Sequence, residues 1–377
     1  MTSWSPIGIL PNLRGSKTAA AEFVASACDT VAFVGSDDLR VQAICEAAPK
    51  FTDLLSRFTD AFGVALDPVV FIVRDDALSF LTAEALLSFR DVVAISIIPY
   101  CRSLNTVHRA TNGIAYSNTF WIYPWTLSKD NEWLTTSTPA FSGIHDVEAF
   151  RGQSSPELPV MEIDDLDSPL LEALVACWKR HYFRKGRRWK DRALFRSLNM
   201  AVQAASLPAG VGTTIFDLGR SISLWVSAFE ILSHPRIGKA GLSTVYPMLE
   251  GISFCERNVG RRRYAAYNPA KKKKAKEPRR SLASWVYGKL YQARNDFLHG
   301  NRVSTKTLSP KGTKNGLFWL APSLYRLALT GFLKLSVDRH LPYWLSGDYE
   351  NSPALRKKLK VYERQSIAER ALLRIRK

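Results

Sequence analysis

The stretch SLASWVYGKLYQARNDFLHGNR, residues 281–302, decides how the second half of the chain folds. Its apolar side chains recur at steps of three and four residues, the spacing that places them on one buried face of a helix. These side chains are Leu282, Trp285, Val286, Leu290, Ala293, Phe297 and Leu298. Gly300 follows the apolar pattern and is placed to end the helix in a left-handed cap. The stretch therefore predicts one long helix packed into a helical domain.

Polar side chains gather at the end of this predicted helix. Arg294, Asn295, Asp296 and His299 fall within its last turn and a half. Asn295 and His299 are four residues apart and share a face. Arg294 lies about 100° around the helix from Asn295, and its long side chain reaches the same side. We therefore expect a guanidinium, an amide and an imidazole close together.

The pattern Arg-Asn-x-x-x-His resembles the signature of the HEPN superfamily, and LYQARNDFLHG (290–300) resembles its ApeA-type branch. Of the six histidines, only His299 has an arginine five positions before it. The segment TTIFDLGRSISLWVSAFEILSH (213–234) predicts a second helix with Glu230 near its end, and 323–340 predicts a closing helix. The resemblance covers residues 170–345 and implies an all-α bundle. It also implies a metal-independent endoribonuclease without a cofactor.

These residue types suit RNA cleavage without a metal. An imidazole gains and loses a proton near physiological pH, so His299 suits proton transfer. A guanidinium is always charged and can hold a phosphate as negative charge develops on it, which suits Arg294. Asn295 can orient the imidazole, and Glu230 and Asp296 are expected as supporting residues. In the alternative interpretation, Arg294 pairs with Glu230 or Asp296, and His299 only caps its helix.

One histidine per chain leaves the roles of acid and base one group short. The HEPN resemblance implies a homodimer in which two motifs face each other across a twofold axis. It further implies a bacterial toxin or anti-phage defence effector with an antitoxin or a trigger protein as partner. Two competing hypotheses are a non-catalytic RNA- or partner-binding module and a HEPN subunit associated with an antitoxin or a nucleotidyltransferase.

Charge divides the chain into two halves. The formal net charge is +18, but residues 1–170 hold 11 Lys and Arg against 21 Asp and Glu, whereas residues 171–377 hold 41 against 13. The basic half favours binding of a polyanion through phosphate contacts, with a merely solvated basic surface as the alternative. The segment 257–280 holds 11 basic residues and one acid and predicts a mobile insertion. The expected RNA contacts are Lys289, Arg302, Arg261, Arg262, Arg263, Lys271, Lys272, Lys273 and Lys274.

The first half predicts an α/β domain. Apolar runs at 31–35, 68–73 and 92–99 read as strands, and 77–91 reads as a helix between two of them. Residues 1–16 carry prolines and glycines typical of irregular structure. Strands that alternate with helices favour some parallel pairing. The expected fold class is therefore α+β, an N-terminal α/β domain followed by an all-α helical bundle.

The expected domains are an acidic sensing or regulatory domain at 1–168, the helical ribonuclease domain at 169–345 and a basic helical tail at 346–377. Five scattered cysteines without a CxxC pair predict reduced thiols and no zinc site. The sequence starts without the pattern of a signal peptide, and no apolar run reaches the length of a membrane span. We therefore expect a cytoplasmic protein.

Overall fold

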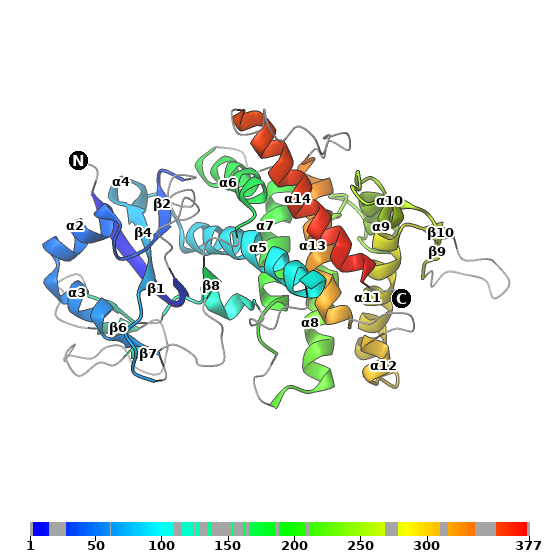
Figure 1. The fold of residues 1–377 in the computed structure, drawn as a ribbon, viewed down its shortest axis with the longest axis horizontal. Helices are drawn as coiled ribbons and strands as arrows, with labels where there is room; N and C mark the ends of the chain where they lie inside the picture. Colours follow the sequence, from blue (N-terminus) through cyan, green and yellow to red (C-terminus); the bar gives the residue numbers. More distant parts are fainter. Residues whose placement is uncertain are drawn as a thin grey trace. The chain divides into compact units, whose positions relative to one another are not determined.

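The computed structural model describes most of the chain and divides into two compact units (Figure 1). Unit 1 comprises residues 1–93 and 113–166, and unit 2 comprises 94–112 and 167–377. The described residues are 3–14, 28–60, 62–108, 115–123, 125–128, 134–136, 152–153, 161–162, 166–184, 188–208, 212–267, 278–309, 316–335 and 352–374. The change of unit at 166/167 lies two residues from the expected boundary, but 94–112 join the second unit rather than the first.

Unit 1 is built on a four-stranded sheet in the order β2-β4-β1-β8. Its strands are β1 (Trp4–Arg14), β2 (Val31–Val34), β4 (Pro68–Arg74) and β8 (Met161–Glu162). Strand β4 pairs antiparallel with both β1 and β2, and only the short β8 runs parallel to β1. The expectation of an α/β layer with parallel pairing therefore gives way to a mainly antiparallel sheet.

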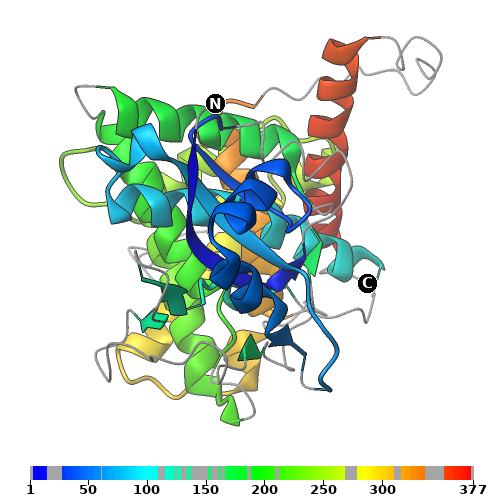
Figure 2. The ribbon, with the colours of Figure 1, turned by 90° about the vertical axis from the view of Figure 1, so that its left-hand side faces the viewer.

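Helices cover both faces of this sheet (Figure 2). On one face, α2 (Leu39–Ala47) and α3 (Pro49–Ser56) bury apolar side chains against residues of β1, β2 and β4. On the other face, the Phe33 and Phe71 rings pack edge to face at 4.5 Å, and Phe89 of α5 (Ala83–His108) packs against both. Because side chains alternate along a strand, each strand contributes to both layers of the core.

Two secondary-structure predictions for the first half of the chain were wrong. Residues 4–14 form β1 despite Pro6 and Pro11, because the strand shifts register at Pro6/Gly8 and again at Leu10/Arg14 and so tolerates these residues. The run at 92–99, expected as a strand, continues helix α5, and every residue from 92 to 98 within it is buried or nearly so. A helix that is buried on all sides is apolar on every face, so its sequence lacks the helical periodicity and cannot be distinguished from that of a buried strand.

The remaining elements of unit 1 are short. They are β3 (Phe58–Thr59), α4 (Asp75–Leu78), the 3-10 helix η1 (Ser117–Phe120), β5 (Trp125–Leu127), β6 (Leu134–Thr136) and β7 (Gly152–Gln153). Strands β5 and β6 pair antiparallel, and β3 pairs parallel with β7.

Unit 2 is helical. Its larger helices are the second part of α5, α6 (Ser168–Phe183), α7 (Trp189–Ala204), α8 (Ile215–Leu232), α9 (Leu242–Glu250), α11 (Leu282–Leu298), α13 (Leu317–Leu333) and α14 (Pro353–Leu373). The short elements are α10 (Arg257–Gly260), β9 (Tyr264–Ala265), β10 (Arg279–Arg280) and α12 (Thr305–Leu308). The helices expected around 213–234 and 281–302 are present. Because unit 1 is built on a sheet and unit 2 on helices, the fold class is mixed α+β, as expected.

The core of unit 2 lies where α7, α8, α11 and α13 meet. Its centre is aromatic: Trp225 and Phe229 of α8 each pack against Tyr325 of α13 with ring centroids 5.4 Å apart. The Tyr325 hydroxyl lies 2.6 Å from the Ser197 hydroxyl, which also donates to the Ala228 carbonyl oxygen. Large aromatic side chains packed against one another in this way fix the relative positions of these helices.

Part of the segment expected as a mobile insertion is folded. Within 257–267, α10 forms, Val259 and Ala266 are buried, and β9 pairs with β10. The prediction treated 257–280 as one charged run and overlooked the apolar residues between its arginines. Residues 268–277 lie outside the described part of the chain. No helix among the described residues is long and apolar enough to cross a membrane.

Candidate active site

The candidate site lies at the C-terminal end of α11, where the chain turns sharply. His299 is the residue that caps the helix, and its backbone N–H donates to the Asn295 carbonyl oxygen at 3.0 Å. Gly300 follows with a φ of +69°, a conformation that residues with a Cβ adopt at a cost. The expected left-handed cap is therefore present. The turn leaves the His299 side chain exposed to solvent.

Arg294 is held by an ion pair with a neighbouring helix. Its Nη1 atom donates to Glu230 Oε2 on α8 at 3.0 Å, and the two side chains are only 16% and 18% exposed. Helices α8 and α11 approach closely at Gly219, where a Cβ would lie 2.4 Å from the Phe297 ring. The alternative interpretation, in which Arg294 pairs with Glu230, therefore describes the observed geometry.

Two tyrosines form the wall behind this ion pair. The Arg294 guanidinium lies 4.5 Å from the centroid of the Tyr291 ring, and Tyr287 packs against Phe229 of α8. The Tyr287 hydroxyl is buried and has no hydrogen-bond partner among the described residues. The sequence prediction missed both tyrosines. The signal was their spacing, because positions 287, 291 and 294 are four and three residues apart and share a face of the helix.

Burial changes the protonation behaviour of these groups. Burial raises the pKa of Glu230 above its usual range, and the nearby Arg294 cation opposes that shift without cancelling it. Burial also raises the pKa of Tyr287 well above its ordinary value, and the Glu230 carboxylate adds to the effect. The site thus holds a cation paired with a carboxylate that is costly to ionise.

The other predicted residues occupy distinct positions around the cap. The Asn295 Oδ1 atom accepts a hydrogen bond from Arg294 Nε at 3.4 Å, so the amide and the guanidinium are neighbours. Asp296 accepts from the Asn301 side chain at 3.1 Å, which directs this carboxylate to the turn after the helix. The His299 side chain makes no hydrogen bond or ion pair with the described residues. Its ring nitrogens are therefore available to a ligand.

The predicted RNA contacts divide into separate groups. Lys289 lies over the Trp285 ring at 5.7 Å and donates to Gln292, on another side of α11 from Arg294. Arg302 is exposed just beyond the cap. Arg261, Arg262 and Arg263 lie around α10 and β9, near the N-terminal end of α11. Lys271, Lys272, Lys273 and Lys274 lie outside the described residues.

The N-terminal end of α11 is built quite differently. Glu250, at the end of α9, accepts hydrogen bonds from the Ser281 backbone and hydroxyl at 2.9 and 2.7 Å and from the Ser284 hydroxyl at 2.6 Å. It also pairs with Arg262 at 2.8 Å. Burial alone would raise the pKa of Glu250, but these hydrogen bonds outweigh it and hold the pKa below its usual range. The carboxylate therefore stays ionised and fixes the start of α11.

The described residues contain no group of three or more His, Cys, Asp or Glu side chains placed to hold a metal ion. Comparison of the chain with protein-family models, curated proteins and solved structures finds no match.

Proposed function

We propose that this chain is a metal-independent endoribonuclease. The observation that carries the proposal is the end of α11, where an exposed imidazole follows a guanidinium and an amide that touch each other. Arg294 approaches the surface from a rigid base formed by Glu230 and Tyr291. A fixed cation and an accessible imidazole at one end of a helix are the groups that cleavage of a phosphodiester without a metal requires.

In the proposed reaction, the 2′-oxygen of one nucleotide forms a bond to the adjacent phosphorus, and the bond from phosphorus to the 5′-oxygen breaks. A base takes the proton of the 2′-hydroxyl, and an acid returns a proton to the departing 5′-oxygen. His299 carries one or both transfers. Arg294 and Asn295 hold the phosphate oxygens while negative charge builds up. The products have a 2′,3′-cyclic phosphate and a 5′-hydroxyl, and DNA is not cut because it lacks the 2′-hydroxyl.

The proposed active form is a homodimer in which the second chain supplies the second imidazole. Light scattering on the purified protein would then give a mass near 85 kDa, twice the 42.3 kDa of one chain. We further propose that the protein is a cytoplasmic toxin or anti-phage defence effector. Unit 1, which carries the acidic part of the chain, would receive a trigger or an antitoxin.

The ion pair between Arg294 and Glu230 favours a second candidate function. A guanidinium that already has a carboxylate partner gives up part of its positive potential. A helical domain with such a neutralised arginine can bind RNA or a protein partner through its basic surface without turnover. In that case the His299 imidazole has no catalytic role, and its removal does not alter the function of the protein.

The deciding experiment is cleavage of an end-labelled RNA in EDTA, with the product ends mapped. We expect His299→Ala to lower the rate by about 100-fold or more, since loss of a general acid or base removes a factor of that order. His108→Ala is the matched control, because His108 is another exposed histidine in the last turn of a helix of unit 2. It should cleave as the native protein does.

Three other outcomes of this experiment would count against the proposal. Equal cleavage by the native protein and His299→Ala would place the chemistry at a different site. RNA binding without cleavage by the native protein, in both monomeric and dimeric fractions, would favour the non-catalytic binding module. Cleavage that requires Mg²⁺ would contradict the proposed mechanism.

A further inference from the structure

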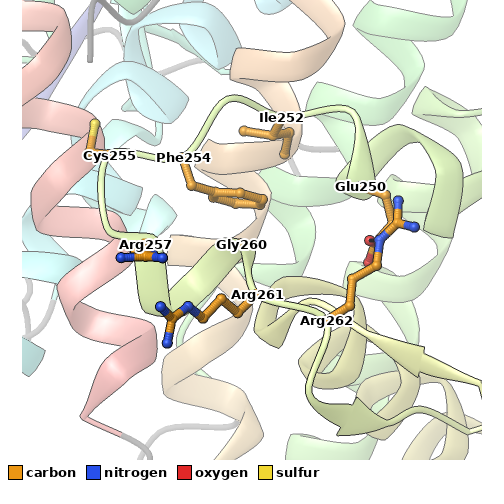
Figure 3. Close-up of a pocket in the computed structure, with 8 residues that line it drawn as sticks. All are labelled: Glu250, Ile252, Phe254, Cys255, Arg257, Gly260, Arg261 and Arg262. Carbon is orange, nitrogen blue, oxygen red and sulfur yellow. Dashed lines mark hydrogen bonds and ion pairs between the residues drawn. The ribbon is translucent and has the colours of Figure 1, made fainter. Parts of the chain in front are cut away.

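A cationic cavity lies in unit 2, away from the end of α11 that carries His299. It encloses about 540 Å³ between the loop after α9, helix α10 and the arginines that follow it (Figure 3). This volume falls within the range of about 300 to 1,000 Å³ typical of small-molecule sites. Glu250 lines it and also binds Ser281 and Ser284 at the start of α11. Eleven residues of helix separate Ser284 from Asn295, which is roughly 17 Å at 1.5 Å per residue.

The charge in this cavity is not balanced by the residues that the structure describes. Three of its lining residues are arginines, and Glu250 is the single carboxylate among them. That carboxylate is already committed to Arg262 and to the two serines at the start of α11. Arg257 and Arg261 make no ion pair or side-chain hydrogen bond with any described residue. Figure 3 shows both side chains extending to the same side of the cavity, away from the pair of Arg262 and Glu250.

The wall of the cavity next to the arginines is apolar and fixed. Ile252 and Phe254 are buried and line the cavity. The backbone of the same loop is anchored to α14, because the N–H groups of Cys255 and Glu256 donate to the Glu369 carboxylate at 2.9 and 2.6 Å. A loop held in this way presents its side chains with little loss of freedom on binding, which favours affinity.

We infer that this cavity binds a nucleotide, with Arg257 and Arg261 holding its phosphate and the wall of Ile252 and Phe254 lying against its base. Guanidinium groups match the geometry of phosphate oxygens. An anion between Arg257 and Arg261 would also relieve the electrostatic repulsion between these two unpaired cations. A single phosphate ion would leave most of the cavity empty, whereas a base against the apolar wall fills it. The nucleotide is either free or the terminal unit of an RNA chain, since both present the same phosphate and base.

This inference stands independently of the ribonuclease proposal, because binding is measured without cleavage. The experiment is calorimetric titration of the full chain with adenosine diphosphate, with inorganic phosphate, and with a short 5′-phosphorylated 2′-O-methyl RNA that lacks the attacking hydroxyl group. The test variant is Arg257→Gln with Arg261→Gln. The matched control is Arg196→Gln with Arg279→Gln, which removes the same charge from exposed arginines that do not line the cavity.

The native protein and the control pair should bind adenosine diphosphate, while the test variant binds it at least about tenfold more weakly because two charged hydrogen bonds are lost. Inorganic phosphate should compete for the same site. If only the RNA binds the native protein, and the test variant binds it at least about tenfold more weakly, the bound nucleotide is the terminal unit of an RNA chain. Equal affinity of the test and control variants, or no binding of either nucleotide probe by the native protein, would overturn the inference. Thermal melting of each variant establishes that it is folded.

Discussion

The two ends of helix α11 differ in almost every physical respect. At the N-terminal end, Ser281 and Ser284 are buried, and their donors meet the Glu250 carboxylate. At the C-terminal end, His299 is exposed and makes no side-chain hydrogen bond with the described residues. The carboxylates at the two ends also differ in their pKa shifts: the pKa of Glu250 is lowered, whereas the pKa of Glu230 is raised.

The difference teaches how one helix can serve two purposes. Hydrogen bonds that satisfy buried groups stabilise the fold, whereas groups left available to solvent can meet a substrate. A site built on the free end of a helix that is anchored at its other end keeps its geometry while it binds. We therefore expect substitutions at the two ends to separate into effects on stability and effects on activity.

The largest change in stability is expected from Glu250→Ala. It leaves the Ser281 N–H and two buried hydroxyls without their acceptor, and we expect the free energy of unfolding to fall by about 3 kcal/mol. His299→Ala, at the exposed end, should change it by less than about 0.5 kcal/mol. Urea denaturation of both variants measures the contrast. Equal losses in the two variants would mean that the ends of α11 are anchored alike.

A smaller effect is expected for the pair of Arg294 and Glu230. The two side chains are mostly but not fully buried, so the coupling between them should lie between the values for surface and buried pairs, at about 1 to 2 kcal/mol. A double-mutant cycle with Arg294→Met and Glu230→Gln measures it. A coupling near zero would show that solvent screens the pair, and Arg294 would then be free for a phosphate.

Gly300→Ala should cost about 1 kcal/mol of unfolding free energy, because alanine disfavours the positive φ of this turn. No atom lies within 4 Å of the position of the added Cβ, so the cost is conformational rather than steric. Gly300→Asn serves as the control, since asparagine tolerates the left-handed region and should cost less. If both variants lose the same stability, a different feature of Gly300 is responsible.

The smallest expected effect is a difference in pH dependence. A lowered pKa means that Glu250 stabilises the fold above its usual range near 4.5, and this stability is lost as pH falls through its folded pKa. A raised pKa means that the contribution of Glu230 is present below that range and is lost as pH rises through its folded pKa. The stability of the native protein relative to Glu250→Gln should therefore rise with pH, and relative to Glu230→Gln it should fall. Slopes of the same sign would contradict one of the two assignments, a rise that for Glu230 and a fall that for Glu250.

Local patterns predicted α11 well but left its partners undecided. The three- and four-residue spacing and Gly300 gave the helix and its cap, because both depend on neighbours in sequence. The choice between a free and a paired Arg294 depends on Glu230, 64 residues away, and no local pattern resolves it. The same limit explains the tyrosines, whose importance follows from their contacts with α8.

The wrong predictions for the first half of the chain have the same origin. Pro6, Gly8 and Pro11 disfavour a regular strand, but β1 accommodates them through shifts in register against β4. At Gly8 an added Cβ would lie 2.3 Å from the Ile122 side chain, so the glycine is required by a distant residue. For residues 92–99, burial on all sides removed the periodicity that separates helix from strand.

The pairing of β1 with β8 also bears on how the protein is synthesised. Arg14 pairs with Glu162, so the edge of β1 that faces β8 stays open until nearly 150 further residues have been translated. At typical rates of synthesis this interval is about 7 to 30 s. Residues 94–112 of unit 2 leave the ribosome within it, so the nascent chain carries an incomplete sheet and an incomplete helical unit together.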